Sequence, residues 1–148
     1  MFEQEPAIIA RFEMCPECRD ISVLVPIQTV KSMVDNFNPE CETCDIGHYF
    51  CLNEDCDVVY FSSEYQYNVS DVKIPVYQKD QGEDVPVCYC HNLTRQKIQV
   101  MIASGVDPVA HLDELMKNDG CSCVINNPQG SCCRNNVILY SQSIKEQA

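Results

Sequence analysis

The sequence has no tryptophan, only five phenylalanines and only ten lysines and arginines. It also lacks a run of about eighteen apolar residues, the length that a helix needs to span a bilayer. The first residues, Met1-Phe-Glu-Gln-Glu-Pro, have neither the basic start nor the apolar core of a secretory signal peptide. We therefore expect a cytoplasmic protein without a membrane span.

Several common catalytic signatures are missing too. The sequence contains no glycine-rich phosphate loop, no nucleophile elbow and no H-E-x-x-H helix. These absences disfavour an enzyme that turns over a bound organic substrate.

The charge balance is strongly acidic, with 22 Asp and Glu residues and a formal net charge of −12. Such a chain repels phosphate backbones, so we expect no nucleic-acid partner. An acidic surface suits docking to a basic patch on a redox partner, and it is equally what solubility alone requires.

Cysteine is the residue that the sequence has in excess, with twelve among 148 residues. A chain of this length makes one ordinary domain or two small ones, and halves of about seventy residues need cross-links or metals. The cysteines are grouped as C-x-x-C, C-x-C and C-C, which places their sulfurs close enough to share one ion. This grouping favours an intracellular metal protein over a secreted disulfide framework.

The first half contains two cysteine pairs with the spacing of zinc ligands. Cys15 and Cys18 form a C-P-E-C knuckle, in which the proline tightens the turn. Cys51 and Cys56 bracket a polar loop inside the hairpin-like run His48–Phe61. Together they predict a closed tetrahedral site of four cysteines, whose zinc would be structural because no position is open.

Other parts of the first half predict the elements around this site. Residues 21–25 read as a strand, and Thr29 is placed to cap a helix that runs to about Phe37. Residues 65–69 and 73–77 read as two more strands, and the polar residues 78–84 read as a linker.

Cys41 and Cys44 form a further pair in an acidic context, E-C-E-T-C-D. They could replace a pair in the zinc site, bind a soft metal such as Cu(I), form a redox dithiol or be incidental thiols. The acidic neighbours disfavour the thiolate form, which counts against a tuned nucleophile.

The second half is organised around residues 85–134, which hold six cysteines: Cys88, Cys90, Cys121, Cys123, Cys132 and Cys133. The segment 94–118 between them reads as two helices joined at Gly105, and residues 134–142 read as a third helix. A C-x-C pair lets both sulfurs reach one iron, so the pattern indicates an iron–sulfur site. Spacing alone does not decide whether Cys121 or Cys123, and whether Cys132 or Cys133, is a ligand of the cluster. Of the three histidines, only His91 is near enough in sequence to influence the cluster.

These motifs resemble two known families. V-C-Y-C-H-N-L-T, the helical hairpin and the terminal cysteines resemble the bacterioferritin-associated ferredoxins, which carry a 2Fe–2S cluster. The motifs C-P-E-C, Y-F-C-L-N-E-D-C-D-V-V-Y-F, P-V-C-Y-C and C-V-I-N-N-P-Q-G-S-C-C occur in the order of another family. They are similar to the N-terminal domain of CopZ-type archaeal copper chaperones, a resemblance that covers nearly the whole chain.

The resemblance implies an α+β protein, with a zinc-stapled β-rich subdomain over residues 1–80 and a helical 2Fe–2S subdomain over residues 81–148. Zinc falls on Cys15, Cys18, Cys51 and Cys56, in agreement with the spacing, and the cluster falls on Cys88, Cys90, Cys123 and Cys133. Cys41, Cys44 and Cys121 have no counterpart in the family pattern, and Cys132 is left as a spare.

The implied function is one-electron transfer, used in the family to reduce Cu(II) to Cu(I) in copper trafficking. Its partner would be a redox protein or a copper carrier or transporter. The alternative is a thiol-based copper chaperone or metal sensor with a structural or regulatory cluster, and a purely structural zinc protein is a third reading.

The family's further domain with an M-x-C-x-x-C copper loop has no match in these residues. We therefore expect a redox module that acts alone or beside a separately encoded carrier.

Overall fold

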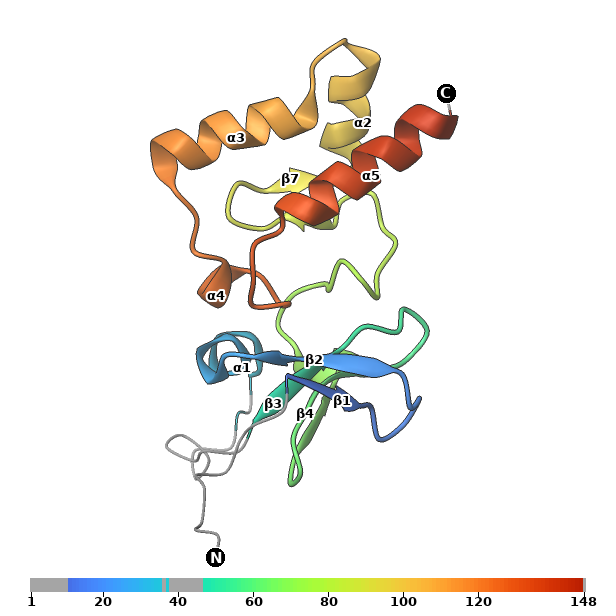
Figure 1. Cartoon of the computed structure of the whole chain (residues 1–148), viewed down its shortest axis with the longest axis vertical. Coiled ribbons are helices and arrows are strands. Elements are labelled where there is room, and N and C mark those ends of the chain that lie inside the picture. The colour runs from blue at the N-terminus through green and yellow to red at the C-terminus, as the bar shows by residue number, and fades with distance from the viewer. Residues whose placement is uncertain (1–10, 36, 38–46, 148) are drawn as a thin grey trace, which may run out of the picture.

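The computed structural model describes residues 11–35, 37 and 47–147. Figure 1 shows a sheet and a short helix at the N-terminal end of the molecule and a group of helices at the other end. This arrangement confirms the predicted α+β class, with a β-rich part followed by a helical part. In the described part of the chain, no helix has both the length and the apolar character needed to cross a membrane.

The N-terminal part is a five-stranded antiparallel sheet with its strands in sequence order. The central pair forms the hairpin predicted over residues 48–61, with Tyr49 opposite Phe61. The strand predicted over residues 21–25 is also confirmed. The strands are β1 (Phe12–Met14), β2 (Ile21–Val25), β3 (His48–Cys51), β4 (Val58–Phe61) and β5 (Gln66–Asn68).

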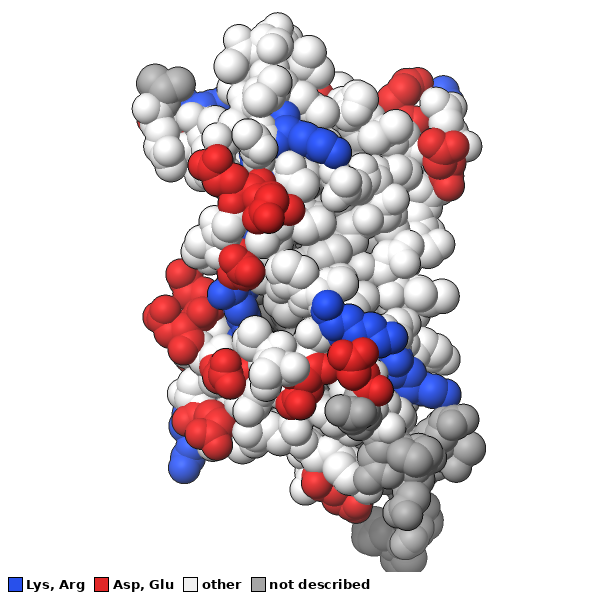
Figure 2. Space-filling model, turned by 180° about the vertical axis from the view of Figure 1, so that it is seen from behind, with Lys and Arg blue, Asp and Glu red and all other residues white. Residues whose placement is uncertain are grey.

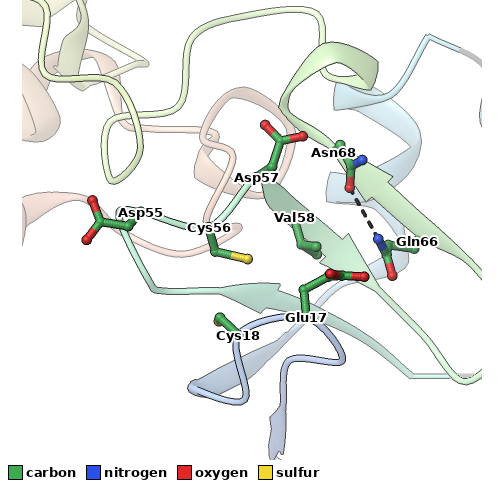
Figure 3. Close-up of a pocket in the computed structure, with 8 residues that line it drawn as sticks. All are labelled: Glu17, Cys18, Asp55, Cys56, Asp57, Val58, Gln66 and Asn68. Carbon is green, nitrogen blue, oxygen red and sulfur yellow. Dashed lines mark hydrogen bonds between the residues drawn. The ribbon is translucent and has the colours of Figure 1, made fainter.

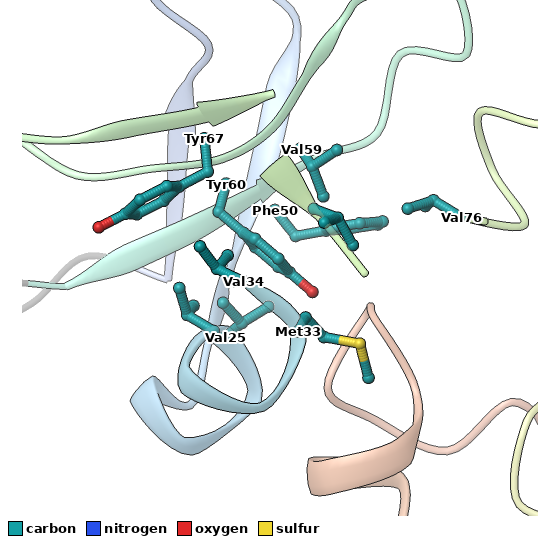
Figure 4. Packing of buried hydrophobic residues seen from close by; sticks show 10 residues of the cluster. Val25, Met33, Val34, Phe50, Val59, Tyr60, Tyr67 and Val76 are labelled. Atoms are coloured by element: carbon teal, nitrogen blue, oxygen red, sulfur yellow. The ribbon is translucent and has the colours of Figure 1, made fainter. Parts of the chain in front are cut away.

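The central hairpin is buried on both faces. One face contributes Phe50 and Tyr60 to the larger core, which Figure 4 shows in close-up. The opposite face contributes Tyr49 and Phe61, whose rings stack 5.6 Å apart beside the cysteines of the first half. Because successive side chains of a strand point to opposite faces, one hairpin serves both the core and the metal site.

Helix α1 (Ile27–Met33) covers the larger core but does not begin where the sequence predicts. Its N-cap is Pro26, whereas Thr29 is fully buried inside the helix. The Thr29 hydroxyl donates a hydrogen bond to the carbonyl of Val124, 2.6 Å away and 95 residues later. The predicted cap was wrong because this hydroxyl has a distant partner that local sequence does not reveal. The helix also ends at Met33, before Phe37.

The strand predicted over residues 73–77 was also wrong. After the 3-10 turn η2 (Val69–Asp71), the chain makes turns and buries Val76 in the larger core. Pro75 has no N–H to donate to a ladder. Its carbonyl accepts a bond from the Tyr89 hydroxyl at 2.6 Å, and that hydroxyl accepts from the N–H of Tyr77 at 2.9 Å.

The polar segment 78–84 is fixed by the buried side chain of Arg95. The guanidinium donates to the carbonyls of Tyr77 at 2.7 Å, Asp80 at 2.6 Å and Gly82 at 3.1 Å. It also lies 4.2 Å from the centre of the Tyr77 ring, within the range of a cation–π contact. The segment therefore has a defined path from the sheet to the first helix of the second half.

The second half confirms the predicted helical hairpin. Thr94 caps one helix by accepting the N–H of Lys97, and Asp107 caps the next, with Pro108 at its first position. The last helix runs five residues beyond its predicted end at Gln142, and α4 was not predicted. The elements are β6 (Pro86–Cys88), β7 (Leu93–Thr94), α2 (Arg95–Ala103), α3 (Pro108–Asp119), α4 (Cys123–Asn126) and α5 (Arg134–Gln147).

The two halves meet where α1 packs against α4. Besides the Thr29 bond, the buried hydroxyl of Tyr60 donates to the carbonyl of Pro128 at 2.5 Å. Gly130 has a φ of +73°, and a Cβ atom there would lie 2.8 Å from the Thr29 hydroxyl oxygen. The contact therefore depends on a close backbone approach that only glycine permits.

We predict that Tyr60→Phe destabilises the protein by about 1–3 kcal/mol, because it leaves the buried Pro128 carbonyl without a donor. Tyr67→Phe is the matched control. The Tyr67 hydroxyl is buried but has no hydrogen-bond partner among the residues that the structure describes. Its removal should leave stability unchanged or raise it slightly. Chemical denaturation of both variants would test this, and equal losses in the two variants would contradict it.

Candidate metal centres

The first knuckle lies in the turn between β1 and β2. Arg19, directly after C-P-E-C, takes the left-handed backbone conformation with a φ of +67° and donates its N–H to the Cys15 carbonyl at 2.9 Å. The N–H of Cys15 in turn donates to the Asp20 carbonyl at 2.9 Å. These bonds close the turn so that Cys15 and Cys18 lie on one side of it.

The second knuckle is the loop between β3 and β4. Asn53 organises it by accepting the N–H of Asp55 on its side chain at 2.9 Å and the N–H of Cys56 on its carbonyl at 3.2 Å. Lys79, from the segment between the halves, donates to the carbonyls of Asn53 at 2.8 Å and Cys56 at 3.2 Å. Sequence reasoning missed this lysine because it lies 23 residues from the nearer of these carbonyls.

The two knuckles bring four sulfurs together. Cys15 and Cys56 are 3.8 Å apart, Cys18 and Cys51 are 3.6 Å apart, and all four sulfurs lie within 4.8 Å of one another. Four thiolates at about 2.3 Å from a tetrahedral zinc ion have sulfur–sulfur separations of about 3.8 Å. The geometry therefore fits the four-cysteine zinc site expected from the sequence, and with four protein ligands such a site is structural.

Hydrogen bonds and burial act in opposite directions on these thiols. Burial raises the pKa of Cys18, but bonds from the Asp20 backbone and the Asn53 side chain outweigh it and lower the pKa to about 7. For Cys51 burial dominates and raises the pKa to about 12, against a lowering by the Asn53 backbone and by Lys79. A bound dication favours all four thiolates, so zinc binding releases protons here.

A hollow opens to solvent beside the four cysteines. Figure 3 shows Cys18 and Cys56 at this hollow together with Glu17, Asp55 and Asp57. Cys18 and Cys56 are half-buried, whereas Cys15 and Cys51 are fully buried. The site is therefore anchored in the protein on one side and faces acidic side chains on the other.

The second half brings four more thiols into its own core. Cys88 ends β6, Cys90 follows in the turn, Cys123 begins α4, and Cys133 directly precedes α5. Cys88, Cys123 and Cys133 are 1%, 7% and 2% exposed, and Cys90 packs against the same apolar cluster. The two remaining cysteines of this region, Cys121 and Cys132, are exposed.

These four thiols form two pairs. Cys90 and Cys123 are 3.8 Å apart, the same separation as Cys15 and Cys56, and the Cys133 thiol lies near enough to Cys88 to lower its pKa. Among the described residues, only the zinc-site cysteines form a group of three or more ligand atoms that all lie within 4.8 Å. The second four sulfurs are therefore less compactly arranged than those of the zinc site. Each contact joins one cysteine of C-Y-C to a cysteine of the terminal segment.

Backbone N–H groups point at these sulfurs. Ser122 donates to the Cys90 sulfur at 3.1 Å, the backbone N–H groups of His91 and Cys90 lower the pKa of Cys88, and the backbone of Cys133 acts in the lowering direction on Cys123. The pKa of Cys88 is lowered to about 6. The Cys133 thiol is the largest cause, the backbone of His91 adds to it, and burial acts in the opposite direction. The loop N–H groups thus favour negative charge on Cys88, whereas burial raises the pKa of Cys123 to about 12 and the Cys88 thiol raises the pKa of Cys133.

His91 also contributes its side chain to this region. The ring donates from Nε2 to the Gly120 carbonyl at 2.8 Å, which holds the loop before α4 close to the C-Y-C turn. The other two histidines lie elsewhere, with His48 buried in the sheet and His111 exposed on α3. Cys41 and Cys44 lie outside the described residues.

Comparisons with known proteins agree with this geometry. A family model of CopZ-type zinc-binding domains matches residues 13–73, which contain both knuckles. The copper chaperone CopZ of Archaeoglobus fulgidus is 34% identical over 85 residues, a match that covers 57% of this chain and 41% of CopZ. The chain therefore spans less than half the length of that chaperone. The crystal structure of the CopZ N-terminal domain from the same organism is similar at 30% identity and a TM-score of 0.66, covering 85% of this chain and 95% of that one.

We predict that Cys56→Ser abolishes stoichiometric zinc binding and unfolds the sheet, because structural zinc contributes about 10–16 kcal/mol of binding free energy that is also folding free energy. Cys121→Ser is the control, since this exposed thiol lies outside both sets of four. Zinc analysis by mass spectrometry and thermal unfolding would measure both effects. Retention of about one zinc by Cys56→Ser would disprove the assignment of this ligand.

Proposed function

Because this chain belongs to the family of the CopZ N-terminal domain, we propose that it is a redox protein that binds zinc and a 2Fe–2S cluster. Cys88, Cys90, Cys123 and Cys133 would hold the cluster, and Cys15, Cys18, Cys51 and Cys56 the zinc. The protein would carry single electrons and reduce Cu(II) to Cu(I) in copper trafficking.

The observation that carries the proposal is the arrangement of the second four thiols as two pairs. A mononuclear site needs all its ligands within one tetrahedron, and these sulfurs are spread more widely. A 2Fe–2S cluster has two irons, each with two protein ligands, so two close pairs in one pocket fit its donor requirement. The burial of three of the four thiols fits a group that must be kept from water.

When bound, the cluster would accept and release one electron at a time. The chain's own contribution is to orient and stabilise the thiolates. The N–H of Ser122 donates to the Cys90 sulfur, and the backbones of His91 and Cys133 favour the thiolates of Cys88 and Cys123. Such interactions raise the reduction potential by stabilising the more negative state. Val87, Leu93 and Val137 close the pocket on its apolar side.

The surface charge supports transfer to a protein partner. Figure 2 shows several separate groups of acidic side chains on one face, with fewer basic ones among them. A partner with a basic docking patch, either an electron donor or a copper carrier or transporter, would be attracted to such a surface. All ten cysteines of the described residues are free thiols, which suits a reducing, cytoplasmic compartment.

The second candidate is a thiol-based copper chaperone or metal sensor with a structural or regulatory cluster. The exposure of Cys121 and Cys132 favours it, because these thiols are free to bind a soft metal. A protein whose cluster does not exchange electrons with Cu(II), but which binds Cu(I) tightly, would support this candidate.

We predict that Cys133→Ser loses the visible spectrum of the cluster, whereas its neighbour Cys132→Ser keeps it. The two positions are adjacent in the chain, but Cys133 is buried among the other three thiols and Cys132 is exposed. Anaerobic purification followed by iron, sulfide and zinc analysis would measure the outcome. We expect about two irons per chain in Cys132→Ser, few in Cys133→Ser, and bound zinc in both.

Two results would count against the proposal. A colourless wild-type protein with zinc but no iron would exclude a cluster. A full cluster in Cys133→Ser that is lost in Cys132→Ser would show that the pocket is closed by the other thiol.

A further inference from the structure

A shallow hollow on the surface holds both exposed cysteines of the second half. It has a volume of about 650 Å³, and Cys121 and Cys132 line it together with Cys123. The walls come from residues 121–125, residues 131–132, the α1 N-cap Pro26 and Gln28 of α1. The two spare thiols therefore open into one space, beside a thiol of the proposed cluster.

Hydrogen bonds fix the backbone on either side of Cys121. The His91 ring holds the carbonyl of Gly120 at 2.8 Å, and the N–H of Ser122 donates to the Cys90 sulfur at 3.1 Å. The Cys121 thiol itself is exposed. The chain is thus anchored while the side chain faces the hollow.

The backbone at Cys132 is fixed in the same way. Gln129 donates from its side chain to the Cys132 carbonyl at 3.0 Å, and Asn127 donates to the Ser131 carbonyl at 3.0 Å. Gln129 is itself held, because its side-chain oxygen accepts from Asn136 at 2.8 Å. Both thiols are therefore presented by rigid segments, which lowers the entropic cost of binding a ligand between them.

The lining of the hollow suits a soft ion. The described residues around it are cysteines, serines, apolar side chains, a proline and a glutamine, and none of them is charged. Hard cations such as Mg²⁺ and Ca²⁺ prefer carboxylate oxygens, which are missing from this set. Thiolates in the absence of carboxylates select soft ions such as Cu(I).

We propose that Cys121 and Cys132 form a two-thiolate binding site for Cu(I) at the outer edge of the cluster pocket. The site deepens the proposed function, on which it rests, by giving the reduced metal a place on this chain. Cu(II) would gain one electron from a one-electron donor protein and become Cu(I), and a cluster held by Cys88, Cys90, Cys123 and Cys133 would supply the one-electron redox centre. The two thiolates then hold the product until a carrier accepts it.

The test is an anaerobic titration of the full, zinc- and cluster-loaded chain with Cu(I), in competition with a chromogenic Cu(I) chelator. Every sample, including the reference protein, carries Cys41→Ser and Cys44→Ser, so that these two thiols do not compete with the proposed site for Cu(I). We expect about one tightly bound Cu(I) per chain. Loss of an outer-shell partner already costs a metal site about 10–100-fold in affinity, so Cys121→Ser with Cys132→Ser should weaken binding by more than about 100-fold.

Ser122→Ala with Ser131→Ala is the matched control, because these residues line the same hollow without offering a thiolate. This variant should bind Cu(I) with the same affinity as the reference protein, which carries only Cys41→Ser and Cys44→Ser. Unchanged Cu(I) affinity after removal of both cysteines would overturn the site, and so would loss of the cluster spectrum in that variant, since the two thiols would then be cluster ligands.

The same samples separate this proposal from the function on which it rests. If the purified protein contains no iron but its Cu(I) binding depends on Cys121 and Cys132, the Cu(I) site is supported and the redox function is excluded. If the iron-loaded protein reduces Cu(II) but binds no Cu(I) at these two cysteines, the redox function is supported and the Cu(I) site is excluded.

Discussion

The crowding of thiols in two small cores is the constraint on which the structure depends. Four sulfurs within 4.8 Å of one another cannot all be charged without a cation, and burial raises the pKa of Cys51 to about 12 when none is present. The residues that surround this set, such as Tyr49, Val58 and Phe61, make only a small apolar cluster. A cluster of this size gains much of its stability from a metal, whereas the opposite face of the sheet packs on the larger core around Phe50 and Tyr60.

The segment between the halves couples the two sets of thiols. Its Lys79 holds the carbonyls of the second zinc knuckle, while Pro75 and Tyr77 hold the hydroxyl of Tyr89, the residue between Cys88 and Cys90. Each thiol set is therefore anchored to the same short stretch of chain. Arg95 fixes that stretch by binding three of its carbonyls without a carboxylate partner among them. The half that contains the four-cysteine zinc site thus provides the support against which the C-Y-C turn is positioned, and this would explain why a structural ion accompanies the proposed redox site.

Local chemistry explains what the sequence predicted well, and long-range contacts explain where it failed. The 48–61 hairpin, the two helices over residues 94–118 and the first C-x-x-C knuckle depend on neighbours a few residues away, and each is found as expected. Thr29 has the ordinary character of a cap, but its hydroxyl binds Val124. Lys79 and Tyr89 carried no recognisable pattern, because their partners are carbonyls, which every residue has. Spacing likewise could not choose between Cys121 and Cys123, since both are within reach of C-Y-C and only the folded chain buries one and exposes the other.

That division between buried and exposed thiols follows from the backbone itself. Cys133 stands at the start of α5, where its carbonyl accepts the N–H of Val137 and its thiol turns into the core. In the non-helical chain before a helix, neighbouring side chains tend to face opposite sides, so the preceding Cys132 points outward. Cys121 and Cys123 are separated in another way, because Cys123 is the first residue of α4 and is buried, whereas Cys121 lies before the α4 N-cap, Ser122, and is exposed. Two short segments that close an internal pocket therefore also place two thiols on the surface outside it. One pair of turns can therefore provide both the pocket for the proposed cluster and the proposed surface site for a soft metal. The chain keeps the two sites close together, because their cysteines are one or two residues apart in sequence.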